Sequence, residues 1–548
     1  MDKKYRWLNE DARTFLSRGY LIDGITPEER VRQIADKSES ILGIDGFANK
    51  FEDYMSRGWF SLSTPVWTNF GLDRGLGISC FGVTIADEMQ DILRAAGEIG
   101  MLSKFGGGTA GYFGDLRPRG AKIKDNGVSS GAVHFMEIFQ AVSNTVNQGN
   151  SRRGHFAAYL PIEHQDYSEF LQAKSEGHPL QDISIAVTVS DEFMEKLVER
   201  DTDAEERWVK LIQKKFETGY PYVLYTGNVN KNKPQVYKDK GMIIKHSQMC
   251  IEIMEYTDDK KSFTCCLSSM NLEYYDEWKD TDAVEVLTYF LDSVLTDFIQ
   301  RAKDIPFLEK VVRFANEHRS IGLGVLGYHT FLQSKNIAFE SISARAYNKQ
   351  IFKLINDKSL KASKELAVLY GEPEMLKGYG ERFTTRLAIA PTTSSSFILG
   401  QVSPSIEPLN SNYFLKDLAK GKFVYRNPFL YKLLTQKEKN NEKVWKSILT
   451  HGGSVQHLEF LTDDEKFVFK TFGEISQLEI VTQAADRQKY IDQSQSLNLM
   501  IHPETPVHEV HALMLEAWKL GVKSLYYQRS ANLAQEVGRD LMNCVMCE

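Results

Sequence analysis

Apolar runs with the length of buried strands alternate with amphipathic helical stretches through most of this chain. The segment 79–85 (SCFGVTI) is predicted to be a strand, and a helix is expected over 87–104. The same order recurs farther along, with a strand expected over 183–190 and a helix over 191–199. Alternation of this kind is typical of proteins in which helices pack against a central sheet. The sequence therefore predicts a mixed α/β fold.

The first 60 residues differ from the rest because their apolar side chains follow helical spacing only. Helices are expected over 11–21 and 27–41, with Thr26 as the N-cap and Pro27 in the first turn of the second helix. At the other end, the residues after about 532 are polar and finish in a cysteine pair, which indicates a flexible tail.

Composition narrows the class of protein. Hydrophobic residues make up 42% of the 548 residues, a fraction too high for a chain that is mainly disordered. The 66 basic and 73 acidic side chains leave a net charge of −7, so no nucleic-acid binding through bulk electrostatics is expected. The N-terminus lacks the apolar stretch of a secretory signal, and the longest uncharged run, 387–406, contains two prolines. We therefore expect a soluble cytoplasmic protein without a membrane span.

A glycine-rich segment, 106–111 (GGGTAG), formally matches the dinucleotide-binding pattern G-x-G-x-x-G. That pattern binds phosphate when it follows a strand and opens a helix, whereas here it follows the helix expected over 89–104. The segment is therefore interpreted as a tight backbone turn and not as a cofactor site.

Six cysteines are too few for a disulfide scaffold in a chain of this length. Cys250 stands two residues before Glu252, so both side chains share one side of an extended or finger-like segment. A neighbouring carboxylate raises the pKa of a thiol and discourages the thiolate. A buried cysteine is most often a packing residue, but this pair also suits a thiyl radical beside a general base.

The other cysteines leave several interpretations open. Cys265 and Cys266 are adjacent in the sequence. Both could be core thiols, both could bind a metal together with a distant C-x-x-C, or one of them could form a redox couple with Cys80. Cys544 and Cys547 form a C-x-x-C near the chain end, which favours a reversible dithiol on a mobile arm. At ~3.3–3.6 Å per residue, the arm after Tyr527 reaches at most about 70 Å.

Two consecutive tyrosines, Tyr526 and Tyr527, follow a helix expected over 507–520. In a strand they would point to opposite faces, and packing is the usual reason for such a pair. Phenols can also relay an electron together with a proton. His508 and His511 on the same helix suggest a metal site only weakly and are expected to be surface residues.

Together these features resemble the catalytic large (alpha) subunit of class I ribonucleotide reductases. The motifs that carry the resemblance follow the family's order from residue 60 to the end of the chain: 63–65 (STP), 79–80 (SC), 116–120 (LRPRG), 147–154 (NQGNSRRG), 247–252 (SQMCIE), 264–265 (TC), 318–324 (HRSIGLG), 391–395 (PTTSS), 403–408 (SPSIEP), 485–493 (ADRQKYIDQ), 526–527 (YY) and 544–548 (CVMCE). Each motif alone is weak, but their shared order makes chance negligible.

The resemblance implies a ten-stranded α/β barrel over 61–530, built from two five-stranded parallel halves around a central finger loop. A short helical region, 1–60, would precede the barrel, and a flexible redox tail, 531–548, would follow it. Only 79 residues precede Cys80, so the family's N-terminal ATP-cone does not fit. Overall regulation by ATP and dATP at such a domain is therefore expected to be absent.

In such an enzyme Cys250 would become the thiyl radical that takes the ribose 3′ hydrogen, with Glu252 as general base. Gln248 stands where the family usually has an asparagine that contacts the region of the substrate's 2′ hydroxyl. Cys80 would protonate the leaving 2′ hydroxyl and then form a disulfide with Cys265. Cys266 would then be a bystander or, alternatively, a competitor for Cys80.

Electron delivery follows from the same resemblance. Cys544 and Cys547 would reduce the active-site disulfide, and thioredoxin or glutaredoxin would reduce them in turn. Tyr527 and Tyr526 would bring the radical from a partner beta subunit that carries a dimetal cofactor. No metal or other cofactor would be bound permanently in this chain.

The family's binding sites map onto two further groups of residues. Ribonucleotide substrates, as diphosphates, would contact Thr64, Ser79, Thr392, Thr393, Ser394 and Ser395. Deoxynucleotide or ATP effectors with Mg²⁺ would contact Asp87, Arg117, Arg119, Gln148 and Arg152. A homodimer is the family's usual assembly.

Three other classes compete with this interpretation. A class II reductase would use adenosylcobalamin and would have no use for the tyrosine pair. A glycyl-radical reductase is not supported, because the sequence contains no glycyl-radical motif near its C-terminus. A zinc-stabilised interaction protein would use Cys265, Cys266, Cys544 and Cys547 as ligands and would contain stoichiometric metal.

Overall fold

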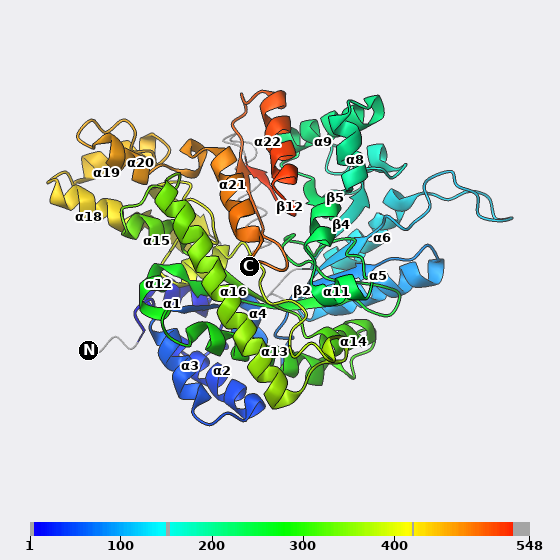
Figure 1. The fold of residues 1–548 in the computed structure, drawn as a ribbon, viewed down its shortest axis with the longest axis horizontal. Helices are drawn as coiled ribbons and strands as arrows, with labels where there is room; N and C mark the ends of the chain where they lie inside the picture. Colours follow the sequence, from blue (N-terminus) through cyan, green and yellow to red (C-terminus); the bar gives the residue numbers. More distant parts are fainter. Residues whose placement is uncertain (1–4, 149–153, 419–420, 530–548) are drawn as a thin grey trace.

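The computed structural model describes residues 5–148, 154–418 and 421–529 (Figure 1). Five parallel strands form the first half of the central sheet, and each pairs with the next one in the chain. These strands are β2 (Cys80–Thr84), β3 (Gly108–Tyr112), β4 (His155–Pro161), β5 (Ser184–Val189) and β6 (Tyr222–Tyr225). Their side chains are almost all buried, as expected for parallel strands covered by helices.

The second half runs in the opposite direction. Its first strand, β7 (Phe263–Asn271), is antiparallel to β2 and parallel to β8 (Ile321–Leu326). Beyond β8 the pairing continues through two parallel bridges, Leu323 with Leu387 and Ile389 with Gln495.

The last strands close the sheet on itself. The short strand β11 (Leu499–Met500) is parallel to β13 (Gln528–Arg529). β12 (Ser524–Leu525) pairs antiparallel with β6, the last strand of the first half. The sheet therefore curls from β2 through β6 and back to β7, and the expected α/β barrel of two parallel halves is confirmed.

Helices surround this barrel (Figure 1). The longest, α16 (Ile342–Tyr370), crosses the front of the view and packs against α13 (Ala283–Ala302). Two further helices, α5 (Met89–Lys104) and α6 (Ala132–Thr145), cover the first half. The other helices of the barrel region are α4 (Thr64–Asn69), α7 (Tyr167–Phe170), α8 (Asp191–Val198), α9 (Thr202–Thr218), α10 (Thr226–Lys231), α11 (Gln235–Asp239), α12 (Tyr275–Trp278), α14 (Glu309–His318), α15 (Tyr328–Ser334), α17 (Thr393–Ile398), α21 (Gln477–Gln488) and α22 (Val507–Lys519), with 3-10 turns at Leu272–Tyr274, Glu374–Leu376 and Phe472–Glu474.

The N-terminal helices are α1 (Glu10–Ser17), α2 (Pro27–Leu42) and α3 (Phe47–Ser56). The predicted cap of α2 is present: the Thr26 side chain accepts from the Glu29 amide, and the Glu29 side chain accepts from the Thr26 amide. The helix ends at Gly43, whose φ of 63° suits a left-handed C-cap. Apolar side chains of all three helices belong to the same core as the barrel.

A small lobe near the end of the chain was not foreseen from the sequence. It comprises the hairpin of β9 (Tyr413–Leu418) and β10 (Gly421–Arg426) and three helices, α18 (Pro428–Gln436), α19 (Glu442–Thr450) and α20 (Asp463–Val468). The remaining strand, β1 (Phe60–Leu62), belongs to the barrel region and pairs with β7. Trp445 and Leu430 lie in a hydrophobic cluster of this lobe that is separate from the main core.

The structure of the glycine-rich segment 106–111 differs in part from the predicted tight turn. Only Gly106, with φ at 86°, forms a turn, and β3 begins at Gly108. A Cβ on Gly111 would lie 2.9 Å from Ile85 and from Phe156, which is closer than atoms pack. The glycines therefore let neighbouring elements approach β3, and the tight turn expected over 106–111 was wrong for the second half of the segment.

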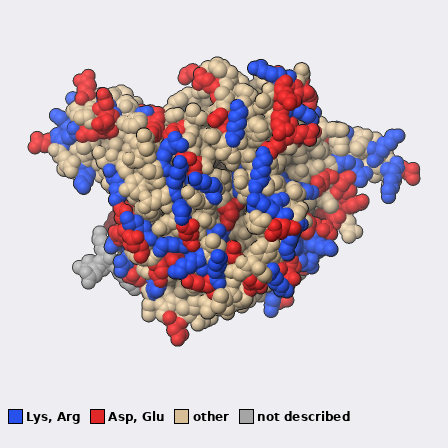
Figure 2. All heavy atoms as spheres, viewed as in Figure 1, with Lys and Arg blue, Asp and Glu red and all other residues tan. Residues whose placement is uncertain are grey.

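The surface in Figure 2 carries interspersed basic and acidic side chains over the face shown. Within the described part of the chain, no helix combines the length and the apolarity needed to cross a bilayer.

Candidate active site

A finger-like loop, which joins α11 to β7, carries Cys250 and Glu252. The Ser247 hydroxyl donates to the Ile253 carbonyl at 2.6 Å, and the Ile253 amide donates to Gln248 Oε1 at 3.0 Å. Between them Ile251 has a φ of 65°, which reverses the chain direction at the tip. Gln248 therefore ties the two sides of the finger together through its own side chain.

Contacts with the barrel hold this finger in place. The Tyr159 hydroxyl on β4 donates to the Gln248 carbonyl at 2.6 Å. On the other side, the Ser494 amide donates to the Glu252 carbonyl at 2.9 Å. The finger tip is thus fixed between the two halves of the barrel.

A cavity of about 120 Å³ opens beside the finger tip. Its walls include Cys250, Glu252 and Cys80. All six residues predicted to contact substrate also line it: Thr64, Ser79, Thr392, Thr393, Ser394 and Ser395. Residues predicted separately from positions more than 300 apart in the chain therefore surround one space.

Glu252 is 1% exposed, and burial raises the pKa of its carboxyl to about 7. The Ser496 hydroxyl lies 3.0 Å from Glu252 Oε2 and 2.6 Å from the Cys250 carbonyl oxygen. The nearby Gln248 side chain, the Glu252 backbone amide and the Ser496 hydroxyl favour the carboxylate and oppose the effect of burial. A carboxyl that titrates near neutral pH is suited to accept and return a proton. Ser496 was not identified from the sequence, because nothing in its local pattern distinguishes it.

Cys80 and Cys265 lie directly opposite each other on the antiparallel strands β2 and β7. Opposed Cα atoms in such a pair are ~4.5 or ~5.5 Å apart, which falls within the range that a disulfide needs. Both residues are thiols in this structure. Burial raises the pKa of the Cys265 thiol, whose sulfur lies 3.6 Å from Gln493 Nε2.

Cys266 occupies the next position on β7, so its side chain points to the opposite face. It is fully buried in the main core, whereas Cys265 belongs to a small cluster against which Cys80 packs. Cys544 and Cys547 lie outside the described residues. Within the described ranges, no group of three or more His, Cys, Asp or Glu side chains is arranged to hold a metal ion.

Two helix N-termini face the cavity. Thr64 is the first residue of α4, and Thr392 stands at the N-cap position of α17 with a φ of 52° and without a capping side-chain hydrogen bond. The Thr392 hydroxyl accepts a hydrogen bond from the Ser405 amide at 2.7 Å. Hydroxyls and backbone amides at helix starts suit an anionic group such as a phosphate.

Tyr526 and Tyr527 lie between β12 and β13, outside regular strand geometry. Their ring centroids are 4.4 Å apart, so the alternation expected for a strand does not apply to this pair. Two tyrosines that the sequence analysis missed, Tyr220 and Tyr222, contact the same rings at 4.5–5.2 Å. Burial raises the pKa of the Tyr527 phenol, and Cys250 is close enough to add to this effect.

The predicted effector residues form ion pairs on the surface. Arg117 Nε lies 2.6 Å from Asp87 Oδ2, and Arg119 pairs instead with Glu169. Gln148 donates to Asn69 Oδ1 at 3.0 Å. Arg152 lies outside the described residues.

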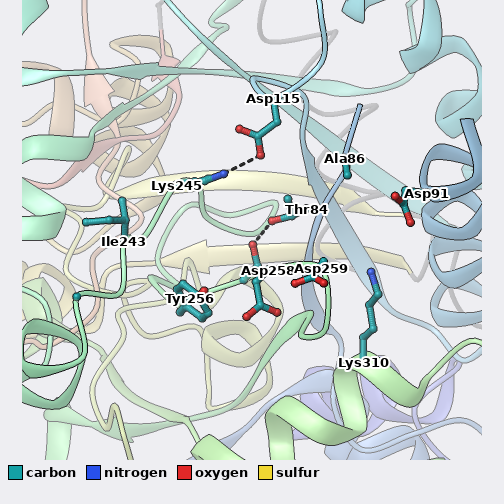
Figure 3. A pocket seen from close by; sticks show the side chains of 12 residues that line it. Thr84, Ala86, Asp91, Asp115, Ile243, Lys245, Tyr256, Asp258, Asp259 and Lys310 are labelled. Atoms are coloured by element: carbon teal, nitrogen blue, oxygen red, sulfur yellow. Dashed lines mark hydrogen bonds and ion pairs between the residues drawn. The ribbon is translucent and has the colours of Figure 1, made fainter. Parts of the chain in front are cut away.

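Cys80, the first residue of β2, lines the cavity beside the finger tip. A second cavity, of about 400 Å³, lies at the opposite end of β2 (Figure 3). It is lined by Thr84, the last residue of β2, and by Asp115 and Lys245, which form a 2.7 Å ion pair. None of the predicted catalytic residues lines it. The two ends of β2 therefore open into different cavities, and Cys80 and Cys250 line the smaller one.

Within the described residues, the fold and the thiol arrangement define a barrel enzyme with a cysteine at a central finger tip. The family model for the ribonucleotide reductase barrel domain matches residues 78–205, 198–374 and 372–528. The ribonucleoside-diphosphate reductase large subunit of Invertebrate iridescent virus 3 is 34% identical, over 93% of this chain and 92% of its own length. A putative large subunit from Frog virus 3 (isolate Goorha) is 36% identical, over 88% of both chains.

Among solved structures, the class Id ribonucleotide reductase alpha subunit of Actinobacillus ureae matches with a TM-score of 0.93 and 52% identity, over 100% of both chains. The chain therefore belongs to the ribonucleotide reductase family, as a class I large subunit. The resemblance inferred from the sequence motifs is confirmed.

Proposed function

We propose that this chain reduces ribonucleoside diphosphates to 2′-deoxyribonucleotides by thiyl-radical chemistry at Cys250. One observation carries the proposal: a single cavity is lined by Cys250, Glu252 and Cys80 together with the predicted substrate residues. The position of Cys265 opposite Cys80 adds a dithiol that can supply two electrons. The choice of diphosphates follows the names of the relatives.

The reaction divides among these side chains as follows. The Cys250 thiyl takes the 3′ hydrogen atom, and Glu252 accepts the 3′ hydroxyl proton. The 2′ hydroxyl then leaves as water with a proton from Cys80. Cys80 and Cys265 together provide two electrons and become a disulfide, and the second thiol hydrogen goes to C2′ in place of the lost hydroxyl. Glu252 returns its proton to the 3′ oxygen, and Cys250 returns its hydrogen atom to C3′. The balance is one ribonucleotide and two thiols converted to one deoxyribonucleotide, one water and one disulfide.

Phosphate binding is assigned to the two helix starts at Thr64 and at Thr392–Ser395. These residues line the same cavity as Cys250 and Glu252. Such a site offers backbone N–H groups and a favourable helix dipole to the diphosphate.

The remaining functions involve other molecules. A partner beta subunit with a dimetal cofactor supplies the radical through Tyr527 and Tyr526. Cys544 and Cys547 pass electrons from thioredoxin or glutaredoxin to the Cys80–Cys265 disulfide. Effector nucleotides with Mg²⁺ bind at Asp87 and Arg117, within a homodimer.

The test is reconstitution with a class I beta subunit, an effector nucleotide, a dithiol and a labelled ribonucleoside diphosphate. Deoxynucleotide should form with the natural chain and should be lost in Cys250→Ser, Glu252→Gln and Tyr527→Phe. Cys266→Ser is the matched control and should retain turnover. If Tyr527→Phe stays active without a beta subunit when adenosylcobalamin is added, the class I mechanism is wrong.

A separate comparison tests the tail. Cys544→Ser should lose turnover with thioredoxin but keep a single round, or turnover with a small dithiol. Equal turnover of Cys544→Ser and the natural chain with thioredoxin would contradict the shuttle.

A further inference from the structure

Four tyrosines pack together where the C-terminal strand closes the barrel against β6. We call Tyr220, Tyr222, Tyr526 and Tyr527 the tyrosine cluster. Tyr222 lies 4.5 Å from Tyr526 and 5.0 Å from Tyr527, measured between ring centroids. Tyr220 contacts Tyr222 at 5.1 Å and Tyr527 at 5.2 Å. The two tyrosines proposed as the radical relay therefore share their surroundings with two more phenols.

The contact between Tyr220 and Tyr527 is a direct hydrogen bond. Their hydroxyl oxygens are 3.0 Å apart, and their rings meet edge to face at 74°. Two other polar contacts of the Tyr220 side chain are longer than this hydrogen bond. Ser184 Oγ lies 3.5 Å from its hydroxyl oxygen, and Lys174 Nζ lies 4.8 Å from its ring centroid. Tyr220 is 1% exposed, so water does not compete for this bond.

Backbone contacts fix the two segments to each other. The Gln528 amide donates to the Gly219 carbonyl at 3.2 Å. The buried Lys215 ammonium group lies 2.7 Å from the Pro221 carbonyl oxygen and 3.3 Å from that of Tyr526. Tyr220 is therefore held in register with Tyr527 by its neighbours on both sides.

Oxidation of a phenol changes what its oxygen can do. When Tyr527 loses one electron and its proton, the neutral phenoxyl oxygen can accept a hydrogen bond but can no longer donate one. The Tyr220 hydroxyl is within reach and carries a proton to donate. In the reduced pair either hydroxyl can be the donor, so this switch of direction needs only a rotation of the Tyr220 O–H.

We propose that Tyr220 is a positioning residue for radical transfer, which donates its hydroxyl hydrogen bond to the oxidised Tyr527 and fixes that oxygen relative to Tyr526. The inference rests on the proposed function. Tyr527 gives one electron and one proton to the radical of the partner subunit. It later takes one electron and one proton from Tyr526. Tyr220 keeps its own electron and proton throughout.

The test uses the full chain with its beta subunit and with 3-aminotyrosine at position 527, where it traps the radical. Deuteron couplings of the trapped radical are measured in heavy water by electron–nuclear double resonance. The natural Tyr220 should contribute one exchangeable deuteron coupling, which Tyr220→Phe should remove. In the chain with tyrosine at 527, Tyr220→Phe should lower kcat about tenfold, the effect of one lost hydrogen bond, with KM for the substrate unchanged.

Tyr225→Phe is the matched control. Tyr225 is also buried, on β6, and its hydroxyl donates to the Met514 carbonyl at 2.9 Å, away from the tyrosine cluster. This variant loses the same atom and one hydrogen bond, and it should leave both the coupling and kcat unchanged. If Tyr220→Phe behaves like Tyr225→Phe in both measurements, the inference is wrong.

A second variant covers the case in which Tyr220→Phe does not fold. Replacing Tyr220 by 3-fluorotyrosine keeps the ring and the hydroxyl but makes the hydroxyl a stronger donor. The deuteron coupling at position 527 should persist and change in size, and an unchanged coupling overturns the inference. If the chain with natural Tyr220 gives neither deoxynucleotide nor a trapped radical, the proposed function itself fails instead.

Discussion

Replacing Glu252 by glutamine separates the stability cost of a buried carboxylate from its chemical use. The side chain is 1% exposed, and burial raises the pKa of its carboxyl from the ordinary 4.5 to about 7. The folded chain therefore keeps a proton on Glu252 at pH values at which the unfolded chain has released it. Ionisation above that range destabilises the folded state.

The magnitude follows from this difference in pKa. Each pKa unit corresponds to ~1.4 kcal/mol, so full ionisation lowers the free energy of unfolding by about 3 kcal/mol relative to acidic pH. The contribution to stability is greatest below pH 4.5, is lost as pH rises, and levels off above pH 7. Between pH 6 and pH 8 the remaining loss is about 1 kcal/mol. Glutamine has a similar shape and no charge, so Glu252→Gln should escape this loss.

The assay is urea unfolding of the natural chain and of Glu252→Gln at pH 6 and at pH 8. The variant should gain about 1 kcal/mol over the natural chain between these two pH values, although it has no turnover at either. Glu217→Gln, at an exposed position, controls for the change in net charge. If the stability difference between Glu252→Gln and the natural chain is the same at both pH values, Glu252 does not carry the raised pKa.

Three other predictions concern the same cavity. Turnover of the natural chain should rise about tenfold from pH 6 to pH 8 as Glu252 ionises. Ser496→Ala should move the midpoint of this pH profile upward, because the Glu252 carboxylate loses a hydrogen-bond donor. An unchanged midpoint would count against the contact between Ser496 and Glu252. Without added reductant, one turnover should consume two thiols, counted by a thiol reagent, in the natural chain and in Cys266→Ser. The same count should find no catalytic thiol loss in Cys265→Ser. Ser394→Ala should raise KM for the diphosphate several-fold with little change in kcat, and an equal fall in kcat would place Ser394 elsewhere in the mechanism.

Much of the site could be predicted because its chemistry depends on residue types in short motifs. Cys250 and Glu252 stand two positions apart on one finger, so their meeting at one cavity follows from local spacing. The α/β fold was also predictable, because the strand and helix periodicities over 79–104 and 183–199 are local properties. The features that depend on local residue spacing could therefore be predicted from the sequence alone.

The rest depended on contacts between distant segments. Ser496 contacts Glu252 across 244 positions of sequence, and no local pattern marks one serine among many. Tyr220 meets Tyr527 across 307 positions, because β12 closes the barrel against β6. The alternation rule failed for Tyr526 and Tyr527 because they occupy the gap between two short strands rather than a regular one.

The joint between the two halves of the barrel decides which cysteine can serve as the partner of Cys80. β7 runs antiparallel to β2, and its register places Cys265 opposite Cys80 and Phe263 opposite Gly82. A Cβ on Gly82 would lie 2.1 Å from the Phe263 ring, so only glycine lets this large side chain pack at the joint. A slip of one residue would turn Cys266 toward Cys80 and would send Cys265 to the opposite face. The packing of Phe263 on Gly82 thus fixes the register, and the register in turn selects Cys265 over its neighbour.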